Sequence, residues 1–342
     1  MTELSDQIEL PGVQVERPGI QEQEWLDLRG NGENKYFLMH WYPTASATST
    51  EKIQPKAAVV FVHGFAEHVK RYNHVFKLFA QAGYEVDGFD QRGYGRTWYE
   101  APDRDRAHGW TTWDDQLTDV AHMIRLVRSR LDAQWGKDKV PIFLFGHSMG
   151  GGISTAFFTR EPGKGPAEDV KKMVSGVMIS APWLDIHFPI PTWFSVPLMR
   201  GVLSLIPRFS FPLGPPSSTL SRDPVVCQAI REDPLCDSYV YSRGLFDPLR
   251  GGPQVVAKDY RRWPEDLPLV AMHGTGDLVT KWSCTKELCD KLKAMGRPVT
   301  FRSFEGYYHE LLHEPGDLKV DAANAYIAWL DEQIASKKAS AP

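Results

Sequence analysis

The chain has 342 residues, of which 42% are hydrophobic, so it is long enough to bury a large core. A net charge of −4 at pH 7 and the lack of a basic stripe exclude nucleic acid as an expected partner. The four cysteines form no Cys-x-x-Cys pair and have no matching histidine spacing, so neither disulfides nor a metal is predicted. The N-terminus has no basic and apolar leader pattern, which favours a cytoplasmic protein.

Short apolar runs alternate with amphipathic segments along most of the chain, as is typical of a parallel sheet with crossover helices. An antiparallel hairpin is predicted first, from residues 22–28 and 36–42 around a turn at 31–34. Further strands are predicted at 57–62, 84–89, 142–145, 176–180, 269–273 and 300–304. Helices are predicted at 72–81, 113–135, 149–160, 282–295 and 320–335.

The alternation breaks between Pro182 and Pro268. Residues 188–213 are strongly apolar, but five prolines and two arginines exclude a simple transmembrane helix, and only a short helix at 196–206 is predicted. We predict a cap inserted at 183–256, dividing an α/β core into residues 1–182 and 257–342. Ligands of α/β sheets bind at the carboxyl ends of the strands, which favours a cap over the site. A helical excursion packed into the core is the alternative.

The stretch Gly146-His147-Ser148-Met149-Gly150 follows an apolar run and leads into a predicted helix. A strand, a glycine-flanked serine and a helix are typical of a nucleophile elbow, in which a strained turn exposes the serine hydroxyl. A chance Gly-x-Ser-x-Gly is the alternative, so further machinery is needed to support Ser148 as a nucleophile.

A serine nucleophile needs a base to take its proton and an acid to orient that base, expected in the order Ser, Asp, His. Asp277 follows the predicted strand at 269–273, and His309 follows the last predicted strand. We predict Asp277 as the acid, with a helix-capping aspartate as the alternative, and His309 as the base. His313 competes for the role of base, but we expect it to line or border the pocket.

Hydrogen-bond donors for a developing oxyanion are predicted at two backbone amides. The N–H of Phe65 follows the predicted strand at 57–62 and Gly64, whose flexibility lets the backbone turn toward the site. The N–H of Met149 lies at the start of the predicted helix, where the helix dipole favours negative charge.

Five motifs in order resemble the monoacylglycerol lipase family of α/β-hydrolases: HGFAEH at 63–68, DQRGYG at 90–95, GHSMGG at 146–151, HGTGD at 273–277 and HELLH at 309–313. The resemblance implies an α/β-hydrolase fold, Ser148, Asp277 and His309 as the triad, and Phe65 and Met149 as oxyanion donors. It also implies that Glu67 and Arg71 are polar residues beneath the glycerol-exit region. A surface ion pair at i,i+4 is the alternative for these two. Ile230 or a neighbour is expected where the mammalian-type cap has a tyrosine.

These features predict a cofactor-free serine hydrolase that cleaves monoacylglycerols to glycerol and fatty acid through an acyl-enzyme. A lysophospholipase, a carboxylesterase or an acyltransferase on the same triad is the alternative, and a non-catalytic binding protein is disfavoured because all three triad residues are present. The apolar segment at 183–213 further predicts peripheral association with membranes or lipid droplets through the cap.

Overall fold

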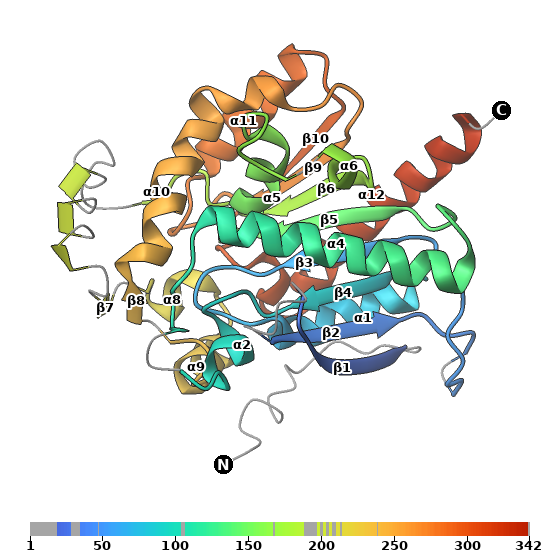
Figure 1. Ribbon diagram of the computed structural model, residues 1–342, viewed down its shortest axis with the longest axis horizontal. Helices are drawn as coiled ribbons and strands as arrows, with labels where there is room; N and C mark the ends of the chain where they lie inside the picture. Colours follow the sequence, from blue (N-terminus) through green and yellow to red (C-terminus); the bar gives the residue numbers. More distant parts are fainter. Residues whose placement is uncertain are drawn as a thin grey trace.

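A single eight-stranded sheet runs through the middle of the molecule, with helices on both faces (Figure 1). The computed structural model describes residues 19–28, 35–46, 48–103, 107–166, 168–187, 197–198, 201–202, 205–206, 210–212, 214–237 and 239–340. The strand order is β1-β2-β4-β3-β5-β6-β9-β10. β1 and β2 are antiparallel to their neighbours, and the other strands are parallel to one another.

The strands of this sheet are β1 (Ile20–Leu26), β2 (Tyr36–Tyr42), β3 (Ala58–Val62), β4 (Glu85–Phe89), β5 (Ile142–His147), β6 (Val174–Ser180), β9 (Leu269–Gly274) and β10 (Val299–Phe304). The α-helices are α1 (Asn73–Gln81), α2 (Gly95–Tyr99), α4 (Trp113–Trp135), α5 (Met149–Thr159), α6 (Glu168–Lys171), α8 (Ser217–Leu220), α9 (Pro224–Glu232), α10 (Ser242–Ala257), α11 (Trp282–Ala294) and α12 (Leu318–Ser340). Short 3-10 helices are η1 (Val69–Tyr72), η2 (Asp259–Arg262) and η3 (Leu311–His313), and β7 (Ser210–Pro212) pairs with β8 (Tyr239–Tyr241).

Alternate residues of the central strands supply two separate hydrophobic cores. On β3, Val60 and Val62 belong to the core that contains the apolar faces of α4, α5 and α11. Val59 and Phe61 point to the opposite face and pack with α1 and α12. Because successive side chains of a strand point to opposite faces, a continuous apolar run such as β3 must be covered on both sides. The two layers of helices meet this requirement.

The long helix α4 illustrates how local signals set the helix ends. The Thr112 hydroxyl accepts a hydrogen bond from the backbone N–H of Asp115, and Asp114 and Asp115 lie in the first turn. Both features stabilise a helix N-terminus. The helix ends at Gly136, which has a φ of 97° that other residues rarely adopt. The predicted bounds of this helix, 113–135, are confirmed.

The other predicted strands and helices are present with shifts of a few residues at their ends. The pairing of the β1–β2 hairpin is confirmed, while the turn at 31–34 lies outside the described residues. The last helix is longer than predicted, because α12 continues through residues 336–340, where no glycine or proline interrupts it. None of the described helices combines the length and the apolar character that crossing a bilayer requires.

The segment between β6 and β9 divides into two parts with different surroundings. The helices α8 and α9 gather at the lower left of Figure 1, near the lower end of α10. The apolar side chains Leu245, Leu249 and Val255 of α10 instead belong to the main core, where α10 packs against α5. The bounds of the predicted cap, 183–256, therefore stay a prediction. Of the predicted helix at 196–206, the described residues 197–198, 201–202 and 205 are helical, residue 206 is described but not helical, and 196, 199–200 and 203–204 lie outside the described residues.

Candidate active site

Ser148 occupies a sharp turn between β5 and α5, as the elbow motif predicts. Its backbone has a φ of 51° and a ψ of −117°, a conformation that is strained for a residue with a side chain. A Cβ on Gly150 would lie 2.0 Å from the Val62 carbonyl oxygen, and one on Gly146 would lie 2.2 Å from the Gly150 carbonyl oxygen. Only glycines allow β3, β5 and α5 to approach so closely. The motif is therefore part of a real strand–turn–helix unit.

The three residues predicted to form a triad meet in the structure. The His309 Nε2 atom lies 2.9 Å from the Ser148 Oγ atom, and its Nδ1 atom lies 2.8 Å from the Asp277 Oδ2 atom. Ser148 follows β5, Asp277 follows β9 and His309 follows β10, so all three lie at the carboxyl ends of parallel strands. This is the edge at which α/β sheets bind ligands.

Asp277 is held by several donors besides His309. Its Oδ1 atom accepts the backbone N–H groups of Val279 (2.7 Å) and Thr280 (2.9 Å). Its Oδ2 atom accepts the Thr280 hydroxyl at 2.8 Å and lies 2.9 Å from His273 Nε2. The alternative of a helix cap is wrong, because the N-cap of α11 is Lys281. The donors fix the carboxylate in position to orient His309.

Electrostatics favour an ionised Asp277 beside His309. Burial opposes ionisation of Asp277, but the nearby His309 and the hydrogen bonds with His273 and His309 outweigh it and hold the pKa of Asp277 well below its usual value. Burial likewise opposes protonation of His309, but the nearby Asp277 carboxylate outweighs it and raises the pKa of His309 above 6.5. Burial lowers the pKa of the neighbouring His147 to about 3, so this second imidazole stays neutral.

The loop after β3 brings the predicted oxyanion donor next to Ser148. A Cβ on Gly64 would lie 3.1 Å from the Ser148 Cβ atom, and Ala66 has a φ of 53°. Phe65 lies between these two residues. Met149 is the first residue of α5, and backbone N–H groups in the first turn of a helix have no acceptor within that helix. Both predicted amides thus lie on segments that border the serine.

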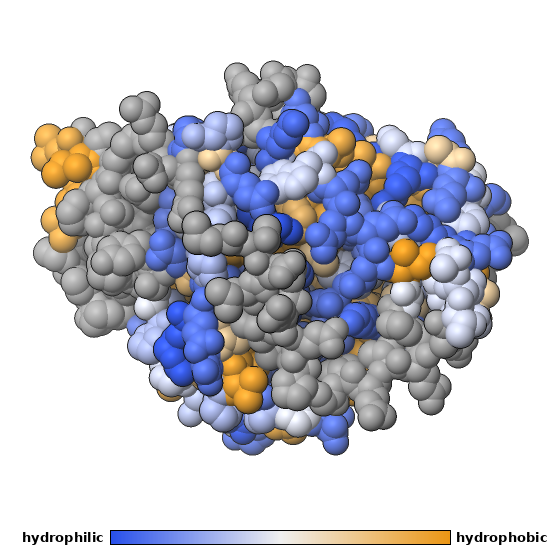
Figure 2. All heavy atoms as spheres, turned by 90° about the horizontal axis from the view of Figure 1, so that it is seen from below, coloured by the Kyte–Doolittle hydropathy of each residue, from blue (hydrophilic) through white to orange (hydrophobic). Residues whose placement is uncertain are grey.

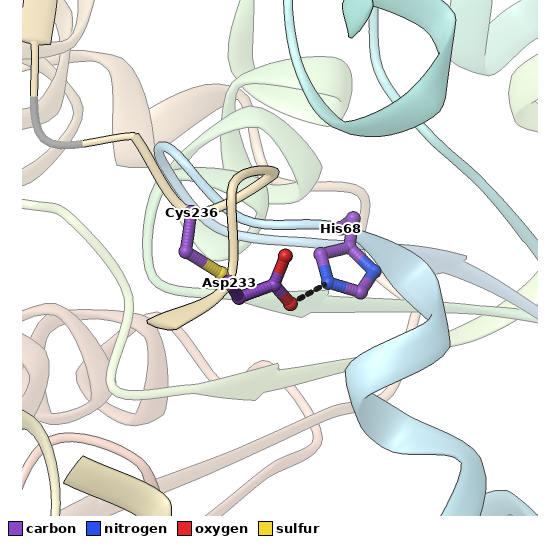
Figure 3. A group of neighbouring side chains, drawn as sticks. All are labelled: His68, Asp233 and Cys236. Carbon is purple, nitrogen blue, oxygen red and sulfur yellow. Dashed lines mark hydrogen bonds and ion pairs between the residues drawn. The ribbon is translucent and has the colours of Figure 1, made fainter. Parts of the chain in front are cut away.

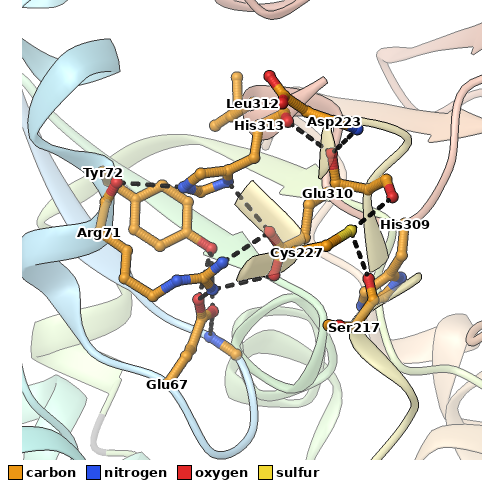
Figure 4. A network of polar contacts seen from close by, with 12 residues as sticks. Glu67, Arg71, Tyr72, Ser217, Asp223, Cys227, His309, Glu310, Leu312 and His313 are labelled. Carbon is orange, nitrogen blue, oxygen red and sulfur yellow. Dashed lines mark hydrogen bonds and ion pairs between the residues drawn. The ribbon is translucent and has the colours of Figure 1, made fainter. Parts of the chain in front are cut away.

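Glu67 and Arg71 take part in a buried network of ion pairs behind this loop (Figure 4). Arg71 forms two hydrogen bonds to Glu310, of 2.9 and 2.7 Å, and one of 2.5 Å to Glu67. Glu67 also accepts the Tyr72 hydroxyl and the backbone N–H of Gly64. The side chains of Arg71 and Glu67 are 10% and 5% exposed, so the alternative of a surface ion pair is wrong. The network links the loop after β3 to the loop that carries His309.

A cavity of about 640 Å³ opens over the Ser148 hydroxyl. Its wall includes Ser148 and His309 together with Glu67 and Arg71, and Ile230 of α9 also lines it. Many of its other wall residues are apolar: Phe65, Trp183, Leu220, Leu245, Leu249 and Leu278. The cavity thus has a polar region beside Glu67 and a larger apolar surface.

His313 does not line the cavity. It is buried at 1% exposure and is not part of the wall of this cavity. Its Nε2 atom lies 3.1 Å from the Arg71 carbonyl oxygen, behind the ion-pair network. The prediction that it lines the pocket is therefore corrected: His313 only borders it, through Arg71 and Glu310, which belong to the cavity wall.

Two further residues of the site were missed. Thr280 contacts Asp277 through both its N–H and its hydroxyl, and Glu310 pairs with Arg71. Thr280 lies three residues after Asp277, a spacing at which an aspartate commonly accepts local hydrogen bonds, so its role could have been suspected. The partner of Glu310 is 239 residues away in the chain, and no local pattern indicates it.

The mostly parallel sheet, the serine elbow after β5 and the Ser148–His309–Asp277 contacts define an α/β-hydrolase with a serine-centred site. Residues 53–316 match the Hydrolase_4 family, described as serine aminopeptidase, S33. A putative monoglyceride lipase of Schizosaccharomyces pombe is 30% identical over 285 residues, which cover 82% of this chain and 69% of the relative. A monoacylglycerol lipase of Mycolicibacterium smegmatis is 29% identical over 269 residues, covering 78% and 85%.

The fold agrees with a solved structure, that of a soluble variant of monoglyceride lipase from Saccharomyces cerevisiae in complex with a substrate analog. The TM-score is 0.77 at 22% identity, and the match covers 94% of this chain and 99% of that chain. The chain belongs to the Hydrolase_4 family, and the predicted α/β-hydrolase fold is confirmed.

We expect the loss of a buried glutamate of this network to destabilise the protein far more than the loss of an exposed glutamate. Glu310→Ala should lower the free energy of unfolding by about 3–5 kcal/mol, because it leaves the Arg71 guanidinium buried without its main partner. Glu287→Ala removes an exposed pair with Lys291 and should change it by less than about 0.5 kcal/mol. Urea denaturation at pH 7 measures both values. Similarly small decreases in the free energy of unfolding of the two variants would show that the buried network stabilises the fold no more than an exposed ion pair does.

Proposed function

We propose that this protein is a serine hydrolase that cleaves the ester bond of monoacylglycerols, releasing glycerol and a fatty acid. The observation that carries the proposal is the continuous contact from Ser148 through His309 to Asp277 at the base of a largely apolar cavity. The curated relatives named monoglyceride or monoacylglycerol lipases support the same substrate class. The reaction is that of a carboxylic ester hydrolase and needs no cofactor in this scheme.

The reaction begins when the Ser148 Oγ atom attacks the ester carbonyl and His309 Nε2 takes the hydroxyl proton. Asp277 keeps the His309 ring in the required orientation and stabilises the imidazolium. The N–H groups of Phe65 and Met149 donate to the oxyanion of the tetrahedral intermediate. The intermediate collapses as His309 protonates the leaving glycerol oxygen, which leaves an acyl group on Ser148. Water then attacks this acyl-enzyme by the same steps and releases the fatty acid.

The cavity wall has an apolar part and a polar part that suit the two ends of a monoacylglycerol. Its apolar wall, with Trp183, Leu245 and Leu249, suits an acyl chain, because burying methylene groups is favourable by about 0.8 kcal/mol each. The Glu67 and Arg71 side chains form the polar part of the wall and suit the glycerol hydroxyls. His313 supports this part from behind by facing the Arg71 backbone, in place of the direct contact predicted from the sequence.

A substrate series tests this function. The ratio kcat/KM should be highest for monoacylglycerols and fall for di- and triacylglycerols, because an enclosed cavity admits one acyl chain more easily than several. Ser148→Ala should remain folded and lose about four to six orders of magnitude in kcat on every ester. A preference for triacylglycerols would contradict the substrate class, whereas full activity of Ser148→Ala would contradict the mechanism.

The pH dependence follows from the charge of His309. The base must be neutral to accept the serine proton, so kcat/KM should fall as the pH drops through the His309 pKa, and this fall should lie above pH 6.5. Asp277→Asn removes the charge that raises this pKa. The fall should then move to lower pH, and kcat should decrease about 10⁴-fold. Activity that rises steadily toward pH 5, or an unchanged profile in Asp277→Asn, would exclude His309 as the base.

We also propose that the protein associates peripherally with membranes or lipid droplets and acts from the cytoplasm. Three large apolar side chains have unusually high exposed fractions: Leu198 (56%), Leu205 (83%) and Ile206 (55%). Figure 2 shows an apolar group at the left edge of the molecule, where Figure 1 draws the described parts of 197–206. Trp183 does not belong to this surface, because it is buried in the cavity wall.

Paired changes test the docking surface. Leu198→Asp with Leu205→Asp should reduce sedimentation with anionic liposomes and the hydrolysis of long-chain monoacylglycerol, because both side chains lose their affinity for the acyl region. Hydrolysis of a short soluble ester should be unaffected. The matched control Val225→Asp changes an exposed apolar residue of α9, at 45% exposure, and should bind liposomes like the parent. Equal liposome binding by the parent, the double variant and the control variant would contradict membrane docking through this surface.

A further inference from the structure

Three side chains of the kinds that bind metals meet beside the active-site cavity (Figure 3). His68 immediately precedes η1, whereas Asp233 and Cys236 lie in the turn after α9. The nearest imidazole nitrogen, carboxylate oxygen and thiol sulfur all lie within 4.8 Å of one another. No metal is predicted from the cysteine and histidine spacing, and the structure brings together His68 and Asp233, which are 165 residues apart in the chain.

We infer that His68, Asp233 and Cys236 form a binding site for a soft divalent cation of the Zn²⁺ class, with water as the fourth ligand. Imidazole, carboxylate and thiolate groups are the ligands that Zn²⁺ takes in proteins. With Zn²⁺ bonds of about 2.0 Å to nitrogen and oxygen and about 2.3 Å to sulfur, tetrahedral ligand atoms are about 3.3–3.6 Å apart. The three ligand atoms lie within 4.8 Å of one another, and His68 Nε2 and Asp233 Oδ2 are 2.8 Å apart, so Zn²⁺ binding requires these two atoms to separate by about 0.5 Å.

A side-chain hydrogen bond within the cluster joins His68 and Asp233 and does not include Cys236. His68 Nε2 lies 2.8 Å from the Asp233 Oδ2 atom, which could be a purely structural pair. The second ring nitrogen of His68, Nδ1, is buried without a hydrogen-bond partner among the described residues, and Cys236 is a free cysteine. The other Asp233 oxygen accepts the Leu235 N–H at 2.9 Å, which orients the carboxylate as a supporting contact orients a metal ligand.

The surrounding charges favour a cation. Three carboxylates contribute negative potential at the Cys236 thiol: those of Asp233, Glu67 and Glu310. The Arg71 guanidinium contributes positive potential there. Lys70 is a second cation near Asp233, so when His68 binds as a neutral ligand three carboxylates face two cations. When Zn²⁺ binds, the zinc–sulfur bond forms as the thiol proton leaves to solvent, and one thiolate with one carboxylate neutralises the ion. The change involves no oxidant or reductant.

A metal at this position would tie two distant parts of the chain together. His68 lies just beyond the Gly64–Glu67 loop that borders Ser148, and Cys236 is part of the cavity wall. A ligand that binds only the folded state stabilises it, so Zn²⁺ should raise Tm. None of the three residues takes part in the proposed ester chemistry. The metal site can therefore be tested independently of the proposed function.

Metal titration of the metal-free, 342-residue protein tests the site. Co²⁺ should bind with one ion per chain and produce the near-ultraviolet sulfur-to-cobalt absorption that only a coordinated thiolate gives. Zn²⁺ should displace it and raise Tm by several degrees, whereas Mg²⁺, which prefers oxygen ligands, should do neither. Absence of the sulfur absorption in the parent protein would overturn the proposal.

Variants identify the ligands. Cys236→Ser should abolish the sulfur absorption, and His68→Gln and Asp233→Asn should each weaken Zn²⁺ binding at least about tenfold. The matched control Cys284→Ser removes a partly exposed thiol of α11 outside the cluster and should bind like the parent. An undiminished absorption in Cys236→Ser would contradict the assignment. Zinc X-ray absorption of the parent gives a test without mutation: one sulfur at about 2.3 Å is expected, and none would refute the site.

Discussion

The close approach of β3, β5 and α5 at Gly150 is the contact on which the rest of the site depends. Any side chain at this position would collide with the Val62 carbonyl, so glycine alone lets α5 start directly behind the end of β5. This approach forces Ser148 into its positive φ and aims its hydroxyl at His309. It also places the first amide of α5 beside the end of β3, where the Phe65 loop begins. The close approach at Gly150 thus sets the positions of Ser148 and of both proposed oxyanion donors.

A second constraint joins the loops that carry the remaining groups. Burying Glu67, Arg71 and Glu310 costs desolvation energy, and that cost is offset only while all of them stay paired. Because Glu310 directly follows His309 and Glu67 accepts a hydrogen bond from the Gly64 N–H, the Arg71 guanidinium ties the segment of His309 to the loop after β3. The stability of this network and the geometry of the triad are therefore linked. A change at Arg71 should disturb both, although it touches none of the triad residues.

Much of the fold was predictable from local pattern, and long-range contacts were not. Glycine spacing around Ser148, the strand before it and the positions of Asp277 and His309 after later strands indicated the triad, because each motif reports its own backbone geometry. The helix α10 was missed, since Pro248 and Pro253 argue against a helix that packing on α5 nevertheless stabilises. The interior position of His313 and the meeting of His68 with Cys236 depend on tertiary structure alone. No periodicity in one sequence reports such meetings.

In the proposed mechanism, the elbow makes the hydroxyl of Ser148 the only nucleophile. The most direct measurement is mass spectrometry of peptides from the parent protein after reaction with a fluorophosphonate, which phosphonylates an activated serine. The account predicts a single adduct on the peptide that contains Ser148, and none on the Ser148→Ala protein treated in parallel. An adduct on a different residue, or equal labelling of the Ser148→Ala protein, would contradict it.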